Sequence, residues 1–427
     1  MTPSTYARLL LDRLGYGRLP VDPDERPAHE LWAASGAMWL SGHPEEPPRA
    51  CPAALASCAQ GVWLALTALA PAQLSPQFAA YRLLGERAAI AGLSRQGRVS
   101  AGGACRLWDM ADGVLALNLA REEDFELLPA WTGGAAASLS DLDPVLRTST
   151  LEPMVARARL LGLAAAAVKA PLPQNTWFAT EPCAEPAATP TQPPLVVDLS
   201  ALWAGPLCGQ LLSECGARVI KVESVQRPDG ARYGPADLFD LLNVRKESVL
   251  IDFSSATDIE VLNALLDRAD IVIEGTRPRA LEQLGIFAAE LVASRPGKVW
   301  LSITGYGRGE PQREWIAYGD DAAVAAGLSW LMGGDRGDPV FGGDAMADPL
   351  TGLHAALTTY ALWLRGGGVV IDMALHNVVS WCLGMRAKAG ALTAEVTPPT
   401  ARRPLCRAAA LGSDTERVLA ELKRGCL

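Results

Sequence analysis

The sequence contains no long apolar run. No segment reaches the ~18 consecutive apolar residues that can span a bilayer, and Arg8, Asp12 and Arg13 interrupt the apolar pattern near the N-terminus. We therefore expect neither a membrane span nor a signal peptide. The net charge of −9 also argues against a nucleic-acid partner, which requires a basic face.

Metal-binding and disulfide patterns are missing as well. The nine cysteines include no C-x-x-C pair and form no zinc-spaced cluster with the four histidines, His29, His43, His354 and His376. We therefore expect no metal site, and reduced thiols in a cytoplasmic protein.

Nucleotide-binding glycine motifs are also absent. There is no P-loop, and the segment after the first expected strand, Ser200–Pro206, holds no G-x-G-x-x-G. The G-x-S-x-G motif of serine hydrolases is absent as well. Glu223 ends the next expected strand, where a ribose-binding acid would lie, but without the glycines the pattern does not predict NAD binding.

The chain does contain a proline-rich segment that divides it. Residues 184–194 read AEPAATPTQPP, with four prolines in eleven residues, which is typical of a stiff, extended linker. The 427 residues are enough for two or three domains. The linker separates residues 1–183 from residues 195–427.

The second part alternates strand and helix patterns. Short β-branched runs predict buried strands at 195–199, 217–223, 248–253, 270–274, 298–303 and 369–373. Helices are expected at 206–216, 258–268, 288–294, 321–332 and 349–364. This alternation predicts an α/β fold with a doubly wound, mostly parallel sheet.

The first part is less regular. Helices are expected at 33–40, 61–69, 122–131 and 152–161. An Asp-Gly pair between apolar runs predicts a β-hairpin over 102–118.

One internal repeat links the two parts. A shift of 291 residues superposes two stretches without a gap, and the matched residues include glycine and tryptophan: Gly36, Trp39, Leu40, Gly42 and Gly61 fall on Gly327, Trp330, Leu331, Gly333 and Gly352. We therefore predict a duplicated helix–loop–helix unit. The copies differ at Asp348, whose counterpart is Ser57.

Asp348 precedes Pro349 and an apolar helix. This pattern predicts a helix N-cap with proline in the first position. A carboxylate at such a place is held ionised and oriented, as a nucleophile requires. A purely structural cap and a catalytic group are both open on this pattern.

Six cations are expected after the ends of the strands, where ligands bind in an open parallel sheet. They are Arg227, Arg232, Arg245, Lys246, Arg277 and Arg279. The alternatives are a solvated basic rim and a pocket for phosphate groups.

Five segments, in order, resemble the family III CoA-transferases, the group that includes formyl-CoA transferase, carnitine CoA-transferase and α-methylacyl-CoA racemase. They are DLSALWAGPLCGQLLSECGARVIKVES (198–224), NVRKESVLIDF (243–253), ADIVIEGTRPRALEQLGI (269–286), KVWLSITGYGRGEP (298–311) and ALGSDTERVLAEL (410–422). The resemblance implies a Rossmann-like domain that binds CoA.

The family's nucleophilic aspartate lies in the pattern [AG]-D-x-x-x-G-[ML]-[HY], which Ala347–His354 matches. The resemblance therefore implies that Asp348 is catalytic. It also implies contacts with coenzyme A, the substrate carrier, at Trp203, Ala204, Arg232, Ile251, Asp252, Phe253, Ser254, Gly275, Thr276 and Arg277.

Four positions depart from the family pattern. A glutamine near the nucleophile is Trp203 here, a phosphate-binding arginine is Gln283, and a CoA-binding lysine is Ile316. These three affect the expected affinity for substrate and CoA. The racemases' catalytic histidine falls on Tyr318 or Asp320, which speaks against a two-base racemase.

The order of the parts also departs from the family. Residues 97–131 resemble the family's small domain, with Gly102 and Gly103 at its mobile glycine loop, yet they precede the sheet domain. The sequence predicts a permuted chain with four parts. These are a degenerate partial repeat of the sheet domain without the aspartate (1–80), a small α/β domain (85–183), the linker (184–194) and the catalytic domain (195–427).

The resemblance implies transfer of CoA from an acyl-CoA to a carboxylic acid through an aspartyl anhydride and thioester. Two alternatives stay open. One is an acyl-CoA isomerase, racemase or related tailoring enzyme with Asp348 as base, to which His29 could contribute. The other is a non-catalytic CoA- or acyl-binding protein, because the family contacts at Gln283 and Ile316 are missing.

The family's interlocked dimers imply a homodimer. Residues 1–80 form two or three expected helices without a sheet, too few to fold alone. We expect them to dock where a second sheet domain would pack, and to bury Trp39 and Trp63.

Overall fold

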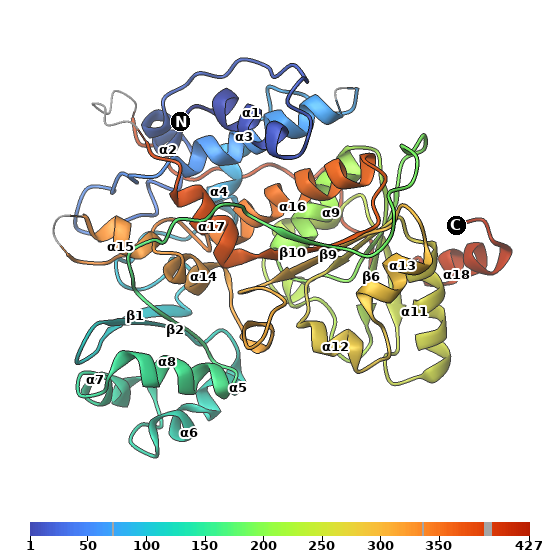
Figure 1. Ribbon diagram of the computed structural model, residues 1–427. Helices are drawn as coiled ribbons and strands as arrows, with labels where there is room; N and C mark the ends of the chain where they lie inside the picture. Colours follow the sequence, from blue (N-terminus) through green and yellow to red (C-terminus); the bar gives the residue numbers. More distant parts are fainter. Residues whose placement is uncertain (71, 335–336, 388–394) are drawn as a thin grey trace.

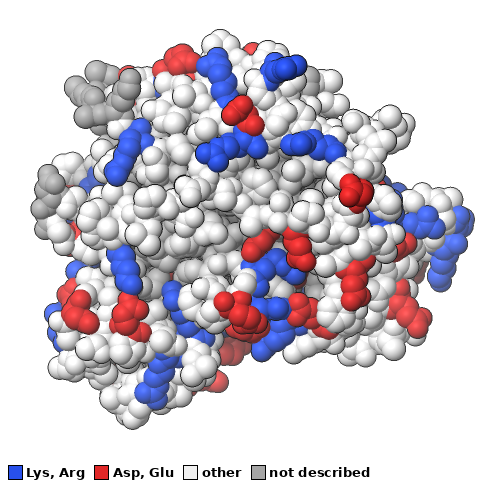
Figure 2. Space-filling model, viewed as in Figure 1, with Lys and Arg blue, Asp and Glu red and all other residues white. Residues whose placement is uncertain are grey.

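The computed structural model describes residues 1–70, 72–334, 337–387 and 395–427, and in these it contains a seven-stranded sheet and a three-stranded sheet (Figure 1). Acidic and basic side chains are interspersed over the face shown in Figure 2, so the negative net charge does not gather there into one surface. Within the described ranges, no helix has the length and apolar character needed to cross a membrane.

The large sheet has the strand order β4-β10-β9-β8-β5-β6-β7. Its strands are β4 (Ala179–Pro182), β5 (Leu195–Asp198), β6 (Arg218–Ser224), β7 (Glu247–Ile251), β8 (Ile271–Glu274), β9 (Val299–Thr304) and β10 (Val369–Ala374). All neighbours are parallel except β4, which runs antiparallel to β10. From the β7 edge, the parallel strands follow the Rossmann order, which reverses between β5 and β8.

Helices cover both faces of this sheet, which confirms the predicted doubly wound fold. On one face lie α9 (Ala204–Glu214) and α16 (Ala347–Leu364); on the other lie α11 (Ala256–Arg268), α13 (Ala288–Ser294) and α18 (Thr415–Arg424). Val196 and Val197 of β5 enter the two cores separately, because successive strand side chains point to opposite faces.

The remaining helices of this part are α10 (Ala236–Asn243), α12 (Pro278–Glu282), α14 (Gly319–Ala325), α15 (Leu328–Gly333) and α17 (Leu375–Leu383). The single helix expected at 321–332 is wrong: α14 and α15 are separate. Gly327 lies between them with φ of +102°, and a Cβ there would come within 2.6 Å of Pro171. Glycine permits this left-handed turn against the neighbouring chain.

The small sheet is antiparallel and confirms the expected hairpin. It consists of β1 (Cys105–Asp109), β2 (Val114–Asn118) and β3 (Ala164–Ala167). Its helices are α5 (Glu122–Glu126), α6 (Leu128–Thr132), α7 (Leu142–Leu146) and α8 (Leu151–Leu160). The helix expected at 122–131 is divided between α5 and α6, because Pro129 has no N–H to continue the hydrogen-bond ladder.

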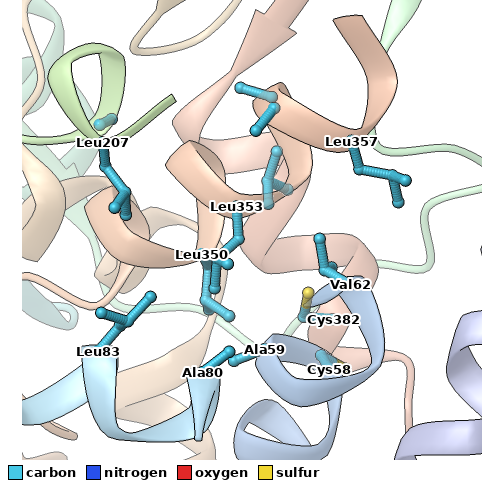
Figure 3. Close-up of a cluster of buried hydrophobic side chains, with 14 of the residues drawn as sticks. Cys58, Ala59, Val62, Ala80, Leu83, Leu207, Leu350, Leu353, Leu357 and Cys382 are labelled. Carbon is cyan, nitrogen blue, oxygen red and sulfur yellow. The ribbon is translucent and has the colours of Figure 1, made fainter. Parts of the chain in front are cut away.

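The N-terminal segment forms α1 (Pro3–Arg13), α2 (Ala28–Ala34), α3 (Leu55–Leu69) and α4 (Leu83–Ala91). The helix expected at 33–40 lies earlier, as α2, because Gly36 adopts a φ of +79° just after it. Figure 3 shows Cys58, Ala59 and Val62 of α3 facing the leucines of α16. Trp63 is buried as expected, whereas Trp39 is 36% exposed and was wrongly expected to be covered.

The elements of the two repeat copies coincide. Shifted by 291 residues, α2 superposes on α14 and α3 overlaps α16, and Gly36 and Gly327 both have positive φ. Each long helix also packs on a partner through a glycine: a Cβ at Gly61 would lie 2.7 Å from the Pro3 carbonyl, and one at Gly352 would lie 2.7 Å from the Ala204 carbonyl. The origin of residues 1–80 in a second sheet domain stays a prediction, which these coincidences support.

The proline-rich linker packs against the sheet domain. Strand β4 lies upstream of the linker, so the large sheet takes its edge strand from the range predicted for the small domain. The linker itself has no helix or strand and crosses Gly366–Gly368, three glycines with positive φ. A side chain at Gly366 would collide with the Ala187 carbonyl, so these glycines allow the close crossing.

Candidate active site

Asp348 lies in the first turn of α16 and points toward the start of α14. The N-cap of α16 is Met346, and no side chain caps the helix, so the expected N-cap role of Asp348 is wrong. Its half-buried carboxylate lies over Gly319, where a Cβ would collide with Oδ2 of Asp348. Glycine at this position leaves room for the carboxylate group.

Three further carboxylates surround Asp348: Asp320, Asp321 and Asp344, all buried. Asp320 accepts a 2.9 Å hydrogen bond from the backbone N–H of Ala345, a non-glycine residue with φ of +41°. Asp321 accepts a 2.9 Å hydrogen bond from Nδ2 of Asn118 on β2. The small sheet therefore contacts α14 directly beside the candidate nucleophile.

Arg87 of α4 provides the positive charge of this group. Its Nε donates to Asp344 at 2.9 Å, and Nη2 donates to the other oxygen of the same carboxylate. The guanidinium also lies 5.5 Å from the centre of the Trp203 ring, and a Cβ at Gly102 would lie 3.1 Å from Nη2. Arg87 thus joins the glycine loop, the start of α9 and the acidic group.

Sequence reasoning missed Arg87. It lies outside every segment that carries the family resemblance, in a helix near the N-terminal repeat. The available signal was a charged pair, Glu86 and Arg87, within the otherwise apolar run of α4. Glu86 is used structurally, in a bidentate ion pair with Arg402.

The environment brings the pKa of Asp348 close to neutrality. Burial, the largest cause, and the neighbouring carboxylates raise the pKa, whereas the charge of Arg87 lowers it, and together they bring it to about 7. Burial likewise raises the pKa of Asp320 to about 6 and that of Asp321 to about 7. Near neutral pH, Asp348 is therefore balanced between its protonated and its ionised form.

Two buried ion pairs lie under the loop before α9. Nζ of Lys246 lies 2.8 Å from Asp198, and Nζ of Lys221 lies 2.9 Å from Asp229. Asp229 also accepts the N–H of Leu202, which has a φ of +69°. These contacts fix the backbone that leads into Trp203.

The expected CoA contacts fall on loops at the carboxyl edge of the sheet, beside the point where strand order reverses. Trp203 and Ala204 begin α9 and are buried, and Ile251, the last residue of β7, is buried as well. Asp252 and Phe253 are half-buried, whereas Ser254 and the Gly275–Arg277 loop after β8 are exposed. Arg232 is less available than expected: its Nε lies 2.8 Å from Glu223, Nη2 also donates to that carboxylate, and the ring of Phe239 lies 4.3 Å away.

The basic rim is smaller than the sequence suggested. Arg245 and Lys246 precede β7 instead of following a strand, and Lys246 is buried against Asp198, so this part of the prediction is wrong. Arg279 lies 3.3 Å from Glu314. Arg227 and Arg277 are exposed, and among the described residues no carboxylate forms an ion pair with them.

None of the described hydrogen bonds or ion pairs joins a histidine to Asp348. His354 lies in the same helix, but its Nε2 is 2.7 Å from the hydroxyl of Tyr6. His43 pairs with Asp338 at 2.7 Å, and His29 lies on α2. Ser57, the counterpart of Asp348, is buried within α3, and its hydroxyl has no hydrogen-bond partner in the described part of the chain.

Comparison with known proteins gives one family. The model of CoA-transferase family III matches residues 194–410, about half of the chain. An acyl-CoA transferase of Fusarium pseudograminearum is 34% identical over 202 residues, which are 43% of this chain and 44% of that protein. A succinyl-CoA–D-citramalate CoA-transferase of Chloroflexus aurantiacus is 31% identical over 43% of this chain and 48% of its own length.

The chain thus spans about half the length of these relatives. Among solved structures, a hypothetical protein from Mycobacterium tuberculosis is 30% identical, with a TM-score of 0.41, over 45% of this chain and 57% of that one.

Proposed function

Because the chain belongs to CoA-transferase family III, we propose that it transfers coenzyme A from an acyl-CoA thioester to a carboxylic acid through covalent intermediates on Asp348. The observation that carries this proposal is the place of Asp348. Its carboxylate is half-buried, feels the charge of Arg87, which itself lies next to Gly102, and belongs to the helix that packs on α9. A partly desolvated, oriented carboxylate is suited to attack a thioester carbonyl.

The first half of the reaction forms a thioester on Asp348. A carboxylate oxygen attacks the acyl carbonyl and the C–S bond breaks, which gives a mixed anhydride and CoA thiolate. The thiolate then attacks the aspartyl carbonyl and releases the donor acid as its carboxylate. The donor acid therefore leaves with one oxygen atom of Asp348.

The second half reverses these steps with the acceptor. The acceptor carboxylate attacks the aspartyl thioester, which gives a second anhydride and CoA thiolate. The thiolate attacks the acceptor acyl carbonyl, the new acyl-CoA leaves, and Asp348 is restored with one oxygen from the acceptor. Arg87 and the N–H groups of the glycine loop would stabilise the negative charge that develops on the carbonyl oxygens.

The loops at the carboxyl edge would hold the CoA portion. Arg227 and Arg277 are the cations best placed to meet its phosphates, because Nε and Nη2 of Arg232 already donate to Glu223. Backbone groups of Ile251–Ser254 and Gly275–Thr276 would line the same edge. Trp203, whose ring is covered by Arg87, would bound the reacting end.

One observation favours a second candidate, an acyl-CoA isomerase or related tailoring enzyme. A carboxylate with a pKa of about 7 is also suited to remove an α-proton at neutral pH. In that case Asp348 would exchange a proton with substrate and form no covalent bond.

Trapping with hydroxylamine separates these functions. The protein is incubated with succinyl-CoA or another acyl-CoA and hydroxylamine, and the peptide that contains Asp348 is analysed by mass spectrometry. A transferase yields a hydroxamate on Asp348; an isomerase instead exchanges the α-proton of acyl-CoA with D₂O, and a binding protein does neither. Asp348→Asn should abolish trapping, whereas the exposed control Asp267→Asn should preserve it.

A further inference from the structure

A cleft of about 340 Å³ lies between the small sheet and the large-sheet part of the chain, away from Asp348. Its walls come from α8, β3, the loop 305–318 after β9, the last residue of α14 and the start of α17; Figure 1 shows α14 and α17 above α8. This volume falls within the ~300–1,000 Å³ that small-molecule sites occupy.

The cleft and the Asp348 site lie at opposite ends of α14. Gly319 lies under Asp348, and Ala325 lines the cleft. Six residue steps at a rise of about 1.5 Å place these two positions about 9 Å apart along the helix. Tyr306 is half-buried and lines the cleft, and its hydroxyl is close enough to Asp321 and Arg159 to feel the charges of both.

Arg159 gives the cleft its chemical character. Its guanidinium carbon lies 3.9 Å from the centre of the Trp315 ring and 5.0 Å from that of the Tyr306 ring. Nε donates to the Ala165 carbonyl at 3.3 Å, but no carboxylate forms an ion pair with Arg159 in the described part of the chain. A stacked, partly buried guanidinium without a counter-charge is suited to hold an anion in two hydrogen bonds.

The other walls combine polar groups with apolar surface. Gln312, His376 and Asn377 offer hydrogen-bonding groups, and Val155, Ala167 and Ala325 offer an apolar wall. Glu152 lies at the exposed rim, where it pairs with Lys169 at 2.5 Å and so leaves its charge compensated. A carboxylate with a short apolar body uses both kinds of wall, whereas a phosphate ion uses only the polar one.

We propose that this cleft is an accessory site for a small organic carboxylate, held at Arg159 and separate from the Asp348 centre. The carboxylate would receive hydrogen bonds from the terminal amino groups of Arg159, and its body would pack against Ala167, Ala325 and the ring of Trp315. This inference does not depend on the proposed transferase reaction, because it concerns binding in the absence of acyl-CoA.

Isothermal titration with isovalerate and with benzoate tests the site on the full chain. We expect saturable binding that weakens about tenfold or more in Arg159→Gln, since hydrogen bonds to charged groups contribute at least that much. Arg157→Gln, an exposed arginine on the same helix, and Asp348→Asn should bind as the wild type does. Ala325→Leu keeps the charge but fills the cleft, and it should also weaken binding if Arg159→Gln fails to fold.

Four outcomes would overturn the proposal. The first is that neither acid shows saturable binding, and the second is that Arg159→Gln, or Ala325→Leu where Arg159→Gln does not fold, binds with wild-type affinity. The third is loss of binding in Asp348→Asn. The fourth is that inorganic phosphate binds as tightly as the carboxylates. Failure of the transferase proposal would leave these titrations unchanged.

Discussion

At Asp348, one guanidinium and three carboxylates act in opposite directions on the same proton. The charge of Arg87 favours the carboxylate form, whereas Asp320, Asp321 and Asp344 favour the protonated form. If the ionised carboxylate is the nucleophile, activity should rise with pH through about 7, the pKa that burial and these charges together give this group. The pH at which activity falls on the acid side of the pH–activity profile, its acid limb, therefore depends on these neighbouring charges.

Substitutions of opposite charge should shift that limb in opposite directions. In Asp320→Asn the limb should move to lower pH, and in Arg87→Gln to higher pH, each by about one unit. The measurement is kcat/KM for the acyl-CoA substrate against pH, with circular dichroism to verify folding. Shifts of the same sign in both variants would show that Asp348 is not the titrating group.

Tyr6 connects the N-terminal segment to α16, the helix that carries Asp348. Its buried hydroxyl lies 2.7 Å from His354 of α16 and accepts the indole N–H of Trp381 at 2.8 Å. In Tyr6→Phe both buried groups lose their partner, so the free energy of unfolding should fall by about 1–3 kcal/mol. Urea denaturation measures this loss. The control is Tyr233→Phe, at an exposed tyrosine, which should leave the urea midpoint unchanged. Equal midpoints for the two variants would contradict the contact of Tyr6 with His354 and Trp381.

The sequence predicted Asp348 and missed Arg87 for a physical reason. The aspartate lies in a local pattern of one helix, which can be recognised without knowing its surroundings. The place of Arg87 in the site depends on its contacts with Asp344 and Trp203, which lie more than a hundred residues away along the chain. Pairing of this kind is a property of the fold, as is the burial of Lys246 against Asp198.

At the scale of elements, the strands of the large sheet were predicted well. Buried parallel strands consist of β-branched residues on both faces, so β5–β10 are visible as short apolar runs. The helix errors come from single residues: Gly327 divides one expected helix and Pro129 another, because backbone conformation there overrides the apolar periodicity. Strand β4 has four exposed side chains and therefore no apolar signal.

Two glycines control helix packing on the side of the sheet covered by α16. Gly61 of α3 and Gly352 of α16 each allow a neighbouring helix to approach through its backbone. Gly61→Ala and Gly352→Ala should each lower the free energy of unfolding by about 1–3 kcal/mol, because a backbone carbonyl lies where the methyl group would be. Thermal unfolding tests both, with Gly309→Ala, which faces open space, as the neutral control; stability equal to the control would contradict the close packing.

At the scale of the whole molecule, the N-terminal segment covers the apolar side of α16. Leu350, Leu353 and Leu357 share one core with Cys58 and Val62 of α3, as Figure 3 shows. Removing residues 1–80 would expose these leucines to water at a cost of about 1.5–3 kcal/mol each. The shortened chain should therefore be insoluble on expression, and a soluble, active product would refute the docking of this segment.

The assembly state is a separate prediction at this scale. The family resemblance implied a homodimer, yet residues 1–80 already pack on α16 of their own chain. We still expect a homodimer that keeps part of the family interface. Sedimentation at micromolar concentration measures this, and a species of only 45 kDa would contradict it.

The central claim, covalent catalysis at Asp348, has a direct isotopic test. In the proposed reaction the acceptor acid leaves one of its oxygen atoms on Asp348 in every turnover. The wild-type protein is incubated with succinyl-CoA and ¹⁸O-labelled succinate, and the peptide that contains Asp348 is then analysed by tandem mass spectrometry. The mechanism predicts ¹⁸O in the Asp348 carboxylate and at no other residue. Exchange of CoA between succinyl groups without ¹⁸O in Asp348 would contradict it.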